Sequence, residues 1–350
     1  MSFFSLSKFS REGLKMTCQI ISKHRGKLMG VAAIWIYIFH ILPSAAFAEA
    51  YGMGKIWWYI RNAGFCGVDM FLFLSGLGLA YHLHRHPISD WRSGLHFLKQ
   101  RFYRIYVVFL PFTLIYALLD RWSIGIILQR LVCLDQFSVN LYNFCWYVCC
   151  ILLMYLLTPM LFELVKRPAA AAVLTAGYLW LLFALRGILR SDLYAIAVRV
   201  PVFVLGLWAA QYSRESRSIG GVGWIVCVAM TMVGFVLSYG LNSRLLQSTL
   251  PACNALVNVL LAPGLCMILA ALFEVLARWS WSAPVGKLLT FFGGISLELY
   301  LMQEWYVRRG KLVLPAQGLV QQVVVFCVMV VLSVALQKLG GLAKLFPKKT

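Results

Sequence analysis

The sequence predicts an all-α protein, a polytopic bundle of about ten transmembrane helices with cytoplasmic termini. Of its 350 residues, 61% are hydrophobic and 13% are charged, whereas a soluble domain has about 25% charged residues. The mean hydropathy is +0.80. The apolar segments run for roughly 20 residues without the alternation of a strand, as expected for spanning helices and not for barrel strands. The chain is therefore expected to be an integral membrane protein.

The spans follow one another along a single domain of residues 1–350. Residues 1–25 form a basic lead-in that we expect on the cytoplasmic surface. Pro43 is expected to bend the first span, and the short, charged stretch 122–134 to lie at the interface as an amphipathic helix. The expected spans are 26–48, 65–83, 103–119, 144–164, 169–189, 196–212, 222–241, 255–277, 288–307 and 318–338.

The distribution of basic residues sets the orientation. If the N-terminus is cytoplasmic, 21 of the 32 Lys and Arg residues fall inside and 10 outside, as the positive-inside rule requires. The cluster from Arg308 to Lys311 fits this bias worst, because it falls outside. The net charge of +20 sits mostly in loops beside spans, which predicts contact with membrane lipid and not with nucleic acid. We expect a multi-pass protein of the cell membrane.

Two ionisable side chains interrupt apolar runs and are the leading candidates for a catalytic pair. His40 lies in the first span and Asp69 in the second, where hydrocarbon makes an unpaired charge costly. His40 is expected past the midplane and Asp69 a turn below the outer face, so the two are expected to share a level. A carboxylate beside an imidazole raises its basicity, as a general base requires. The alternative is a hydrogen bond that only joins two helices.

A basic pair marks the cytoplasmic entry of the third span. Arg101 and Arg104 are three residues apart, so they share one face of a helix. Guanidinium groups suit phosphate, which makes the pair a candidate binding site for a phosphorylated co-substrate. Anchoring to lipid headgroups is an equally good explanation of the pair alone.

Several other side chains in or beside spans are candidates for binding substrate or supporting the site. Arg199 and Glu298 are costly to bury, so they count as site or site-support residues. Hydroxyl groups in spans more often form interhelical hydrogen bonds, and aromatic residues at helical spacing more often pack. The set is Ser75, Trp146, Tyr147, Arg199, Ser296, Glu298 and Tyr300.

In their order along the chain, these motifs resemble the membrane-bound acyltransferase-3 family, whose ten-span enzymes acylate surface glycans and related acceptors. No single match is diagnostic, but the ordered set covers nearly the whole chain. The matches are His40, Gly67-Val68-Asp69 with Phe71, Ser75 and Gly76, Arg101-x-x-Arg104-Ile105, Trp146-Tyr147 with Tyr155 and Pro159, Arg199-x-Pro201-x-Phe203-x-x-Gly206, and Gly294-x-Ser296-x-Glu298-x-Tyr300-Leu301.

The resemblance implies an O-acyltransferase, most simply an O-acetyltransferase, that uses acetyl-CoA or another acyl-CoA as co-substrate and has no bound cofactor or metal. The acceptor would be a cell-surface polysaccharide or a lipid-linked sugar. Arg101 and Arg104 would hold the phosphates of CoA, and His40 would act as general base or carry the acyl group itself.

Two positions depart from the family pattern. The family usually has Arg or Lys eleven residues before the histidine, where this chain has Met29. Arg25, one turn lower and about 60° off that face, is expected to substitute if the helix extends so far. Gln303 stands where the family often has a second histidine.

Two other functions remain open from the sequence. In a proton-coupled transporter or flippase, His40, Asp69 and Glu298 would relay protons. The paired broken helices typical of such transporters are not evident, since Pro263-Gly264 stands in one span without a counterpart. In a catalytically silent relative, the changes at Met29 and Gln303 would have removed activity.

Overall fold

The computed structural model describes residues 19–41, 54–136, 145–185, 188, 191–214, 219–241, 254–310 and 318–342. Within these ranges every regular element is helical, which confirms the predicted fold class. Most of the basic lead-in, the bend at Pro43 and Lys311 lie outside the described residues. The elements are α1 (Gln19–Lys23), α2 (Arg25–Ile41), α4 (Gly54–Ala63), α5 (Cys66–Arg85), α6 (Trp91–Asp120), α7 (Ile124–Leu131), η2 (Leu134–Gln136), α8 (Trp146–Val165), α9 (Pro168–Ala184), α10 (Ser191–Ala197), α11 (Val200–Arg214), α12 (Gly221–Leu241), α14 (Asn254–Leu276), α15 (Ser282–Gly294), α16 (Ser296–Trp305), η3 (Tyr306–Gly310) and α18 (Leu319–Leu342).

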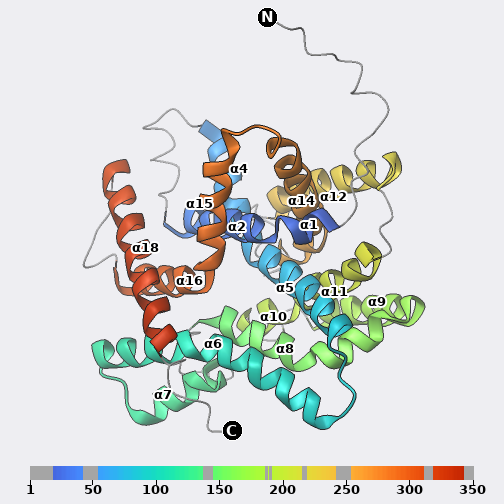
Figure 1. Ribbon diagram of the computed structural model, residues 1–350. Helices are drawn as coiled ribbons and strands as arrows, with labels where there is room; N and C mark the ends of the chain where they lie inside the picture. The colour runs from blue at the N-terminus through green and yellow to red at the C-terminus, as the bar shows by residue number, and fades with distance from the viewer. Residues whose placement is uncertain are drawn as a thin grey trace, which may run out of the picture.

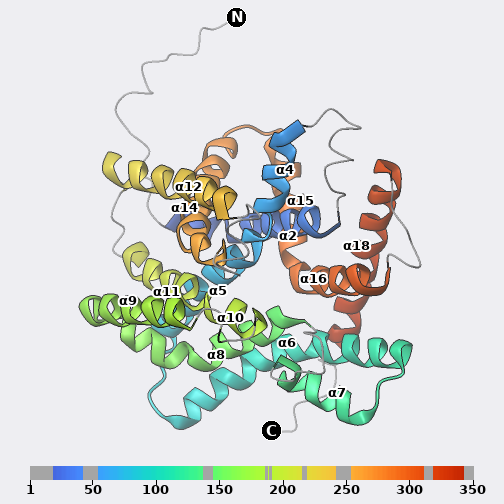
Figure 2. The same cartoon turned by 180° about the vertical axis from the view of Figure 1, so that it is seen from behind.

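The helices form a bundle with α5 near its centre (Figure 1, Figure 2). The span Tyr59–Arg85 contains α5, and 89% of its most apolar stretch is buried inside the protein. In the span Gly221–Ser238 of α12, the corresponding share is 17%. Because α12 is as apolar as α5 and yet exposed, its side chains face lipid. The peripheral position of α12 is visible in both views.

The described residues contain seven helices that are long and apolar enough to cross a membrane, or eight if the bent pair of α15 and α16 is one span. The chain is therefore a multi-pass membrane protein. The two remaining expected spans fall on α2 and α9, each with 17 described helical residues, at the lower end of the spanning length. The total of ten spans and the cytoplasmic termini stay predictions.

One expected span, 288–307, is not a continuous helix. The chain bends by 65° between α15 and the segment Ser296–Gly310. The break follows Gly293 and Gly294, which have poor helix propensity. Gly293 also lies against the backbone of α2, where a Cβ would stand 2.1 Å from the carbonyl oxygen of Gly26. The bend turns α16 away from α15 and toward α18, as Figure 1 shows.

The third span also differs from its expected bounds, because α6 begins well before residue 103. Asp90 caps the helix: its side chain accepts a hydrogen bond of 2.7 Å from the backbone N–H of Ser93, and the Ser93 hydroxyl accepts one from the Asp90 N–H. These bonds hold the pKa of Asp90 below its usual value. The capping box therefore starts the helix in the polar stretch that precedes the span.

Glycines let the central helices approach closely. Between α5 and α11, a Cβ on Gly76 would lie 2.4 Å from the carbonyl oxygen of Phe203, and one on Gly206 would lie 2.1 Å from that of Phe73. Gly30 of α2 is equally close to the backbone of Leu289 in α15. Small residues are common at helix crossings in membranes. There the hydrophobic effect does not drive helices together, so close van der Waals packing must do so.

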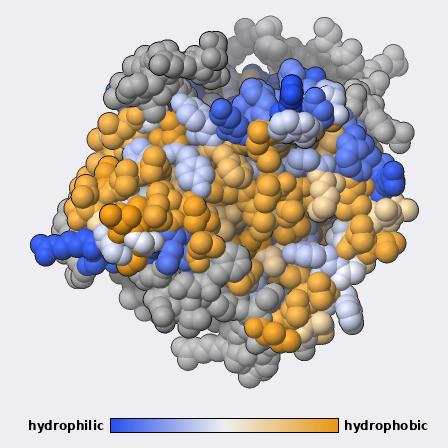
Figure 3. All heavy atoms as spheres, turned by 90° about the horizontal axis from the view of Figure 1, so that it is seen from below, coloured by the Kyte–Doolittle hydropathy of each residue, from blue (hydrophilic) through white to orange (hydrophobic). Residues whose placement is uncertain are grey.

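Seen from below, the surface of the bundle carries broad apolar areas, with hydrophilic side chains gathered at the left edge and the upper right (Figure 3). Exposed apolar residues include Leu114 and Leu118 of α6 and Leu156 and Met160 of α8. An apolar surface of this extent is expected where a protein contacts lipid.

We expect Gly206→Ala to destabilise the protein, because the added methyl group must push α5 and α11 apart. Overpacking of this kind costs about 1–3 kcal/mol, and thermal unfolding in detergent measures it. Gly177→Ala on α9 is the matched control, since nothing lies within 4 Å of its Cβ position. Equal melting temperatures for the two variants would contradict the close crossing.

Candidate functional site

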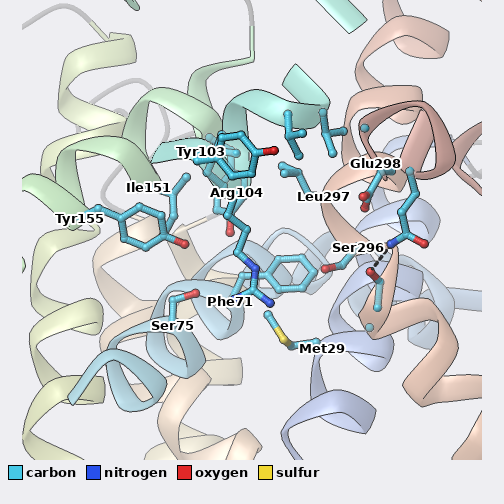
Figure 4. Close-up of a pocket in the computed structure, with 18 of the residues that line it drawn as sticks. Met29, Phe71, Ser75, Tyr103, Arg104, Ile151, Tyr155, Ser296, Leu297 and Glu298 are labelled. Atoms are coloured by element: carbon cyan, nitrogen blue, oxygen red, sulfur yellow. Dashed lines mark hydrogen bonds between the residues drawn. The ribbon is translucent and has the colours of Figure 1, made fainter. Parts of the chain in front are cut away.

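A cavity of about 560 Å³ lies between α2, α5, α6, α8, α16, α18 and the end of α15. It brings together side chains that are far apart in the sequence, and Figure 4 shows them converging from several helices. The lining includes these residues singled out from the sequence: Arg25, Ser75, Arg104, Tyr147, Ser296 and Glu298.

Arginine side chains from two helices make the cavity basic. Arg104 extends from α6 into the cavity, toward the side lined by Phe71 and Met29 (Figure 4). Arg25 lines the cavity from the start of α2. Its guanidinium packs on Gly78, where a Cβ would lie 2.7 Å from Nη1.

Arg101 is not among the residues that line the cavity. Its guanidinium carbon lies 5.4 Å from the centre of the Phe97 ring. It is still close enough for its charge to act on Arg25 and Arg104. Arg101 therefore adds to the positive potential of the cavity without facing into it.

The structure bears directly on the departure at Met29. Met29 lines the cavity, and α2 extends back to Arg25, which lines it too. The helix therefore includes Arg25, as is required if Arg25 is to take the place of the basic residue that the family usually has at the position of Met29. Arg104 lines the same cavity from α6.

The opposite wall is formed by α16 and α18. Ser296 and Glu298 line the cavity from the first turn of α16, and the side chain of Glu298 is 6% exposed. Gln337 of α18 donates a hydrogen bond of 2.9 Å to the Gly294 carbonyl, at the bend before α16. This bond ties the bent segment to α18 and holds the start of α16 at the cavity.

Hydroxyl groups supply further polar contacts. Ser75 and Tyr155 point toward the cavity from α5 and α8 (Figure 4). Tyr147 lines it deeper along α8, and its backbone N–H donates to the hydroxyl of Tyr300 at 3.4 Å. The rings of Tyr147 and Tyr300 are 5.2 Å apart, so Tyr300 supports the wall from behind.

Asp69 belongs to a separate buried polar cluster. Its Oδ2 accepts a hydrogen bond of 2.7 Å from Asn258 of α14, and its Oδ1 lies 3.5 Å from Nε of Arg199. Arg199 also donates to the Ala195 carbonyl at 2.6 Å and stacks at 4.6 Å on the ring of Trp146. Asp69 has no exposed surface and Arg199 is 5% exposed. The cluster joins the segments around α5, α8, α11 and α14.

His40 and Asp69 do not lie at one level. A Cβ on Gly64 would meet the Trp35 carbonyl, and one on Gly67 would meet that of Ala32, which places Asp69 beside about residue 30 of α2. His40 lies about ten residues farther, or roughly 15 Å along the axis. The Asp69 carboxylate is held instead by Asn258 and Arg199.

His40 is partly buried and lies beyond the cavity on the same helix face as Met29. The distance between the two along α2 is roughly 16 Å. Ala33 and Ile36, each 2% exposed, lie between them on that face. The histidine and the arginines therefore occupy opposite ends of α2.

A family model described as an acyltransferase domain matches residues 28–338. The chain belongs to the acyltransferase-3 family. The match begins beside Met29 and ends beside Gln337, so it covers the Asp69 cluster, His40 and most of the cavity lining, while Arg25 lies just before it. No match was found among curated proteins or solved structures. Membership of this family, together with the apolar helices, makes the chain a multi-pass membrane acyltransferase.

Some residues of the site were not singled out from the sequence. Tyr103 and Gln337 line the cavity, and each stands at the end of an apolar run where polar residues are common. The Arg25 guanidinium packs against Gly78, which has no side chain to block it. Asn258 was visible as a polar residue in a span, and only the fold shows that its partner is Asp69.

We expect Arg199→Gln to reduce the yield of folded protein sharply. It leaves a buried carboxylate without its counter-ion, and breaking such a pair costs about 3–5 kcal/mol. Size-exclusion chromatography of a fluorescent fusion measures the folded fraction.

The double variant Asp69→Asn with Arg199→Gln is the test of the pair. Removing both charges is expected to recover much of the folded fraction. Losses that simply add in the double variant would contradict the ion pair.

Proposed function

We propose that this acyltransferase moves an acyl group, most simply acetyl, from cytoplasmic acyl-CoA to a hydroxyl group of a cell-surface polysaccharide or lipid-linked sugar. The observation that carries the proposal is the cavity in which Arg25 and Arg104 meet Ser75, Tyr155 and other polar groups. Its volume of about 560 Å³ lies within the roughly 300–1,000 Å³ of small-molecule sites.

The arginines would bind the donor through its phosphates. Arg104 is exposed and Arg25 is partly buried, so part of this positive charge is accessible to a donor from solvent. Guanidinium groups bind phosphate oxygens in pairs, and such charge-assisted hydrogen bonds are about twice as strong as neutral ones. Arg101 would contribute attraction from outside the lining.

The chemistry would take place at the His40 end of α2. The imidazole would accept the proton of the acceptor hydroxyl as its oxygen attacks the thioester carbonyl. The C–S bond would then break, and the thiolate of CoA would leave and be protonated. In the covalent variant, the acyl group would pass first to the imidazole and then to the hydroxyl. In both variants the thioester must reach past Ala33 and Ile36.

In this scheme Asp69 is a positioning residue. Both carboxylate oxygens are engaged by Asn258 and Arg199, so the group is held where it ties α5 to its neighbours. Its effect on transfer would come through the placement of Phe71 and Ser75, which line the cavity on the same helix.

We expect His40→Ala to abolish acyl transfer while the protein still reaches the membrane and stays folded. The loss follows from removing the proton acceptor or acyl carrier. Transfer of radiolabelled acetyl from acetyl-CoA to glycan in membrane vesicles measures it. His96→Ala, at an exposed position of α6, is the control, and full transfer by the His40 variant would exclude this histidine from the reaction.

We expect Arg104→Gln to raise the KM for acetyl-CoA about tenfold with a small effect on kcat. Loss of a charge-assisted hydrogen bond to a phosphate costs about 1.5–3 kcal/mol. Arg92→Gln removes an exposed arginine from the first turn of the same helix and is expected to leave KM unchanged. A fall in kcat alone in the Arg104 variant would argue against a role in donor binding.

One observation favours a transporter as the second candidate. The 65° break between α15 and α16 is the kind of discontinuous helix from which transporter sites are built. Among the described residues it is the single such pair, whereas transporters usually carry two in related halves. Acetyl-CoA-dependent labelling of glycan separates the two functions, since a transporter would not produce it.

A further inference from the structure

A second cavity opens on the lipid-facing side of the bundle, between α6, α16 and α18. Its volume is about 240 Å³, and its lining side chains are apolar or aromatic, among them Ile115, Leu119, Met302, Trp305 and Leu336. Ile115 is 48% exposed and Leu119 is 65% exposed, so the cavity is a groove open to the surroundings. In a membrane protein those surroundings are hydrocarbon.

Charged residues gather at one end of this groove. Asp120 follows Leu119 directly and pairs with Arg309 at 3.0 Å. Arg309 stands four residues after Trp305, and Arg308 beside it pairs with Glu304. Arg121 is exposed at the same helix end. The end of an apolar groove thus carries three arginines and two carboxylates.

The excess of positive charge here runs against the distribution in the rest of the chain. Arg308 and Arg309 belong to the cluster that fits the cytoplasmic bias of Lys and Arg worst. Arginines on the non-cytoplasmic side work against the predicted orientation of the chain in the membrane. A functional contact made by these arginines would offset that disadvantage. At the boundary of a membrane, the anion that arginine meets is phosphate.

The groove adjoins the site already described. Val107, Val108 and Gly340 line the first cavity, while Phe112 and Leu336 line the groove one turn farther along the same two helices. The two cavities are therefore neighbours on α6 and α18.

The basic end of the groove lies toward His40. The Tyr37 hydroxyl donates at 2.8 Å to the Gln322 carbonyl near the start of α18, and Tyr37 is close enough to interact with Tyr306, beside Arg308. Tyr37 is one turn from His40 on α2. A headgroup on these arginines would therefore lie at the His40 end of the bundle.

We propose that the groove binds the hydrocarbon chain of the acceptor, a lipid-linked sugar whose phosphate lies on Arg308 and Arg309. This inference rests on the proposed function and selects the lipid-linked acceptor over a free polysaccharide. The chain would lie along Ile115, Leu119 and Leu336, and the sugar would extend from the phosphate toward His40. On binding, Arg308 and Arg309 would give up some of their contacts with Glu304 and Asp120 and form hydrogen bonds to the phosphate oxygens instead.

Photo-crosslinking of the full chain in lipid nanodiscs tests the groove without any acyl transfer. The probe is a polyisoprenyl phosphate with a diazirine in its chain, and mass spectrometry locates the labelled peptides. We expect label on residues 112–119 and 332–339, displaced by unlabelled polyisoprenyl phosphate and at least tenfold less well by the uncharged polyisoprenol.

Two variants probe the two parts of the site. Ala335→Trp adds bulk at an exposed position of the groove wall and is expected to cut labelling at least fivefold. Ala172→Trp, at an exposed position of α9, is its control and should label normally. Arg308→Gln with Arg309→Gln is expected to lower the affinity for the phosphate probe about tenfold and leave that for polyisoprenol unchanged.

A phospholipid bearing a diazirine in one acyl chain supplies the opposing result. If it labels the groove equally well and polyisoprenyl phosphate does not displace it, the groove holds only bulk lipid and the inference is wrong. Labelling unaffected by Ala335→Trp would also overturn it. The crosslinking experiment contains no acetyl-CoA, so its result is independent of acyl transfer. Groove labelling by a protein that shows no acyl transfer in vesicles would overturn the proposed function alone. Acyl transfer to glycan by a protein that shows no groove labelling would overturn this inference alone.

Discussion

The buried ion pair between Asp69 and Arg199 is the interaction on which the arrangement of the central helices depends. Both side chains are shielded from solvent, and neither charge is tolerated alone in a low-dielectric interior. Asn258 completes the carboxylate's contacts from α14. Since α5 carries Asp69 and also contributes Phe71 and Ser75 to the cavity wall, the pair fixes the helix from which the site is built.

The site is distributed along α2, with arginines at one end and the histidine at the other. This separation suits a reaction whose two substrates approach from opposite sides of a membrane. In the reaction proposed above, a long donor would bind through its phosphates in the basic cavity and extend its thioester toward His40. The proposed acceptor would then need to reach only the far end, where the groove and its arginines lie. The path between the two ends passes the packed residues Ala33 and Ile36, so the proposed transfer would require this part of the bundle to open.

Much of this organisation could be predicted because hydrocarbon imposes simple rules. Long apolar runs predicted helices, and the polar residues inside them predicted where side chains would pair. Glu298 was singled out in this way, Arg104 by its position at the entry of a span and Ser75 by the family resemblance, and all three line one cavity. The sequence predicted His40 as the partner of Asp69, whereas the structure pairs this carboxylate with Asn258 and Arg199. The choice depends on how far α5 slides along α2 and α11, which the glycine contacts decide.

The amino-acid sequence by itself determined the helical class, the family and most of the side chains that form the site, because burial in lipid leaves a chain few alternatives to helices with paired polar groups. Only the tertiary structure decided the levels of His40 and Asp69, the break between α15 and α16, and the groove beside α18. These features depend on close contacts between helices distant in sequence, such as Gly293 against Gly26. Such contacts follow from three-dimensional packing, and no local pattern of residues encodes them.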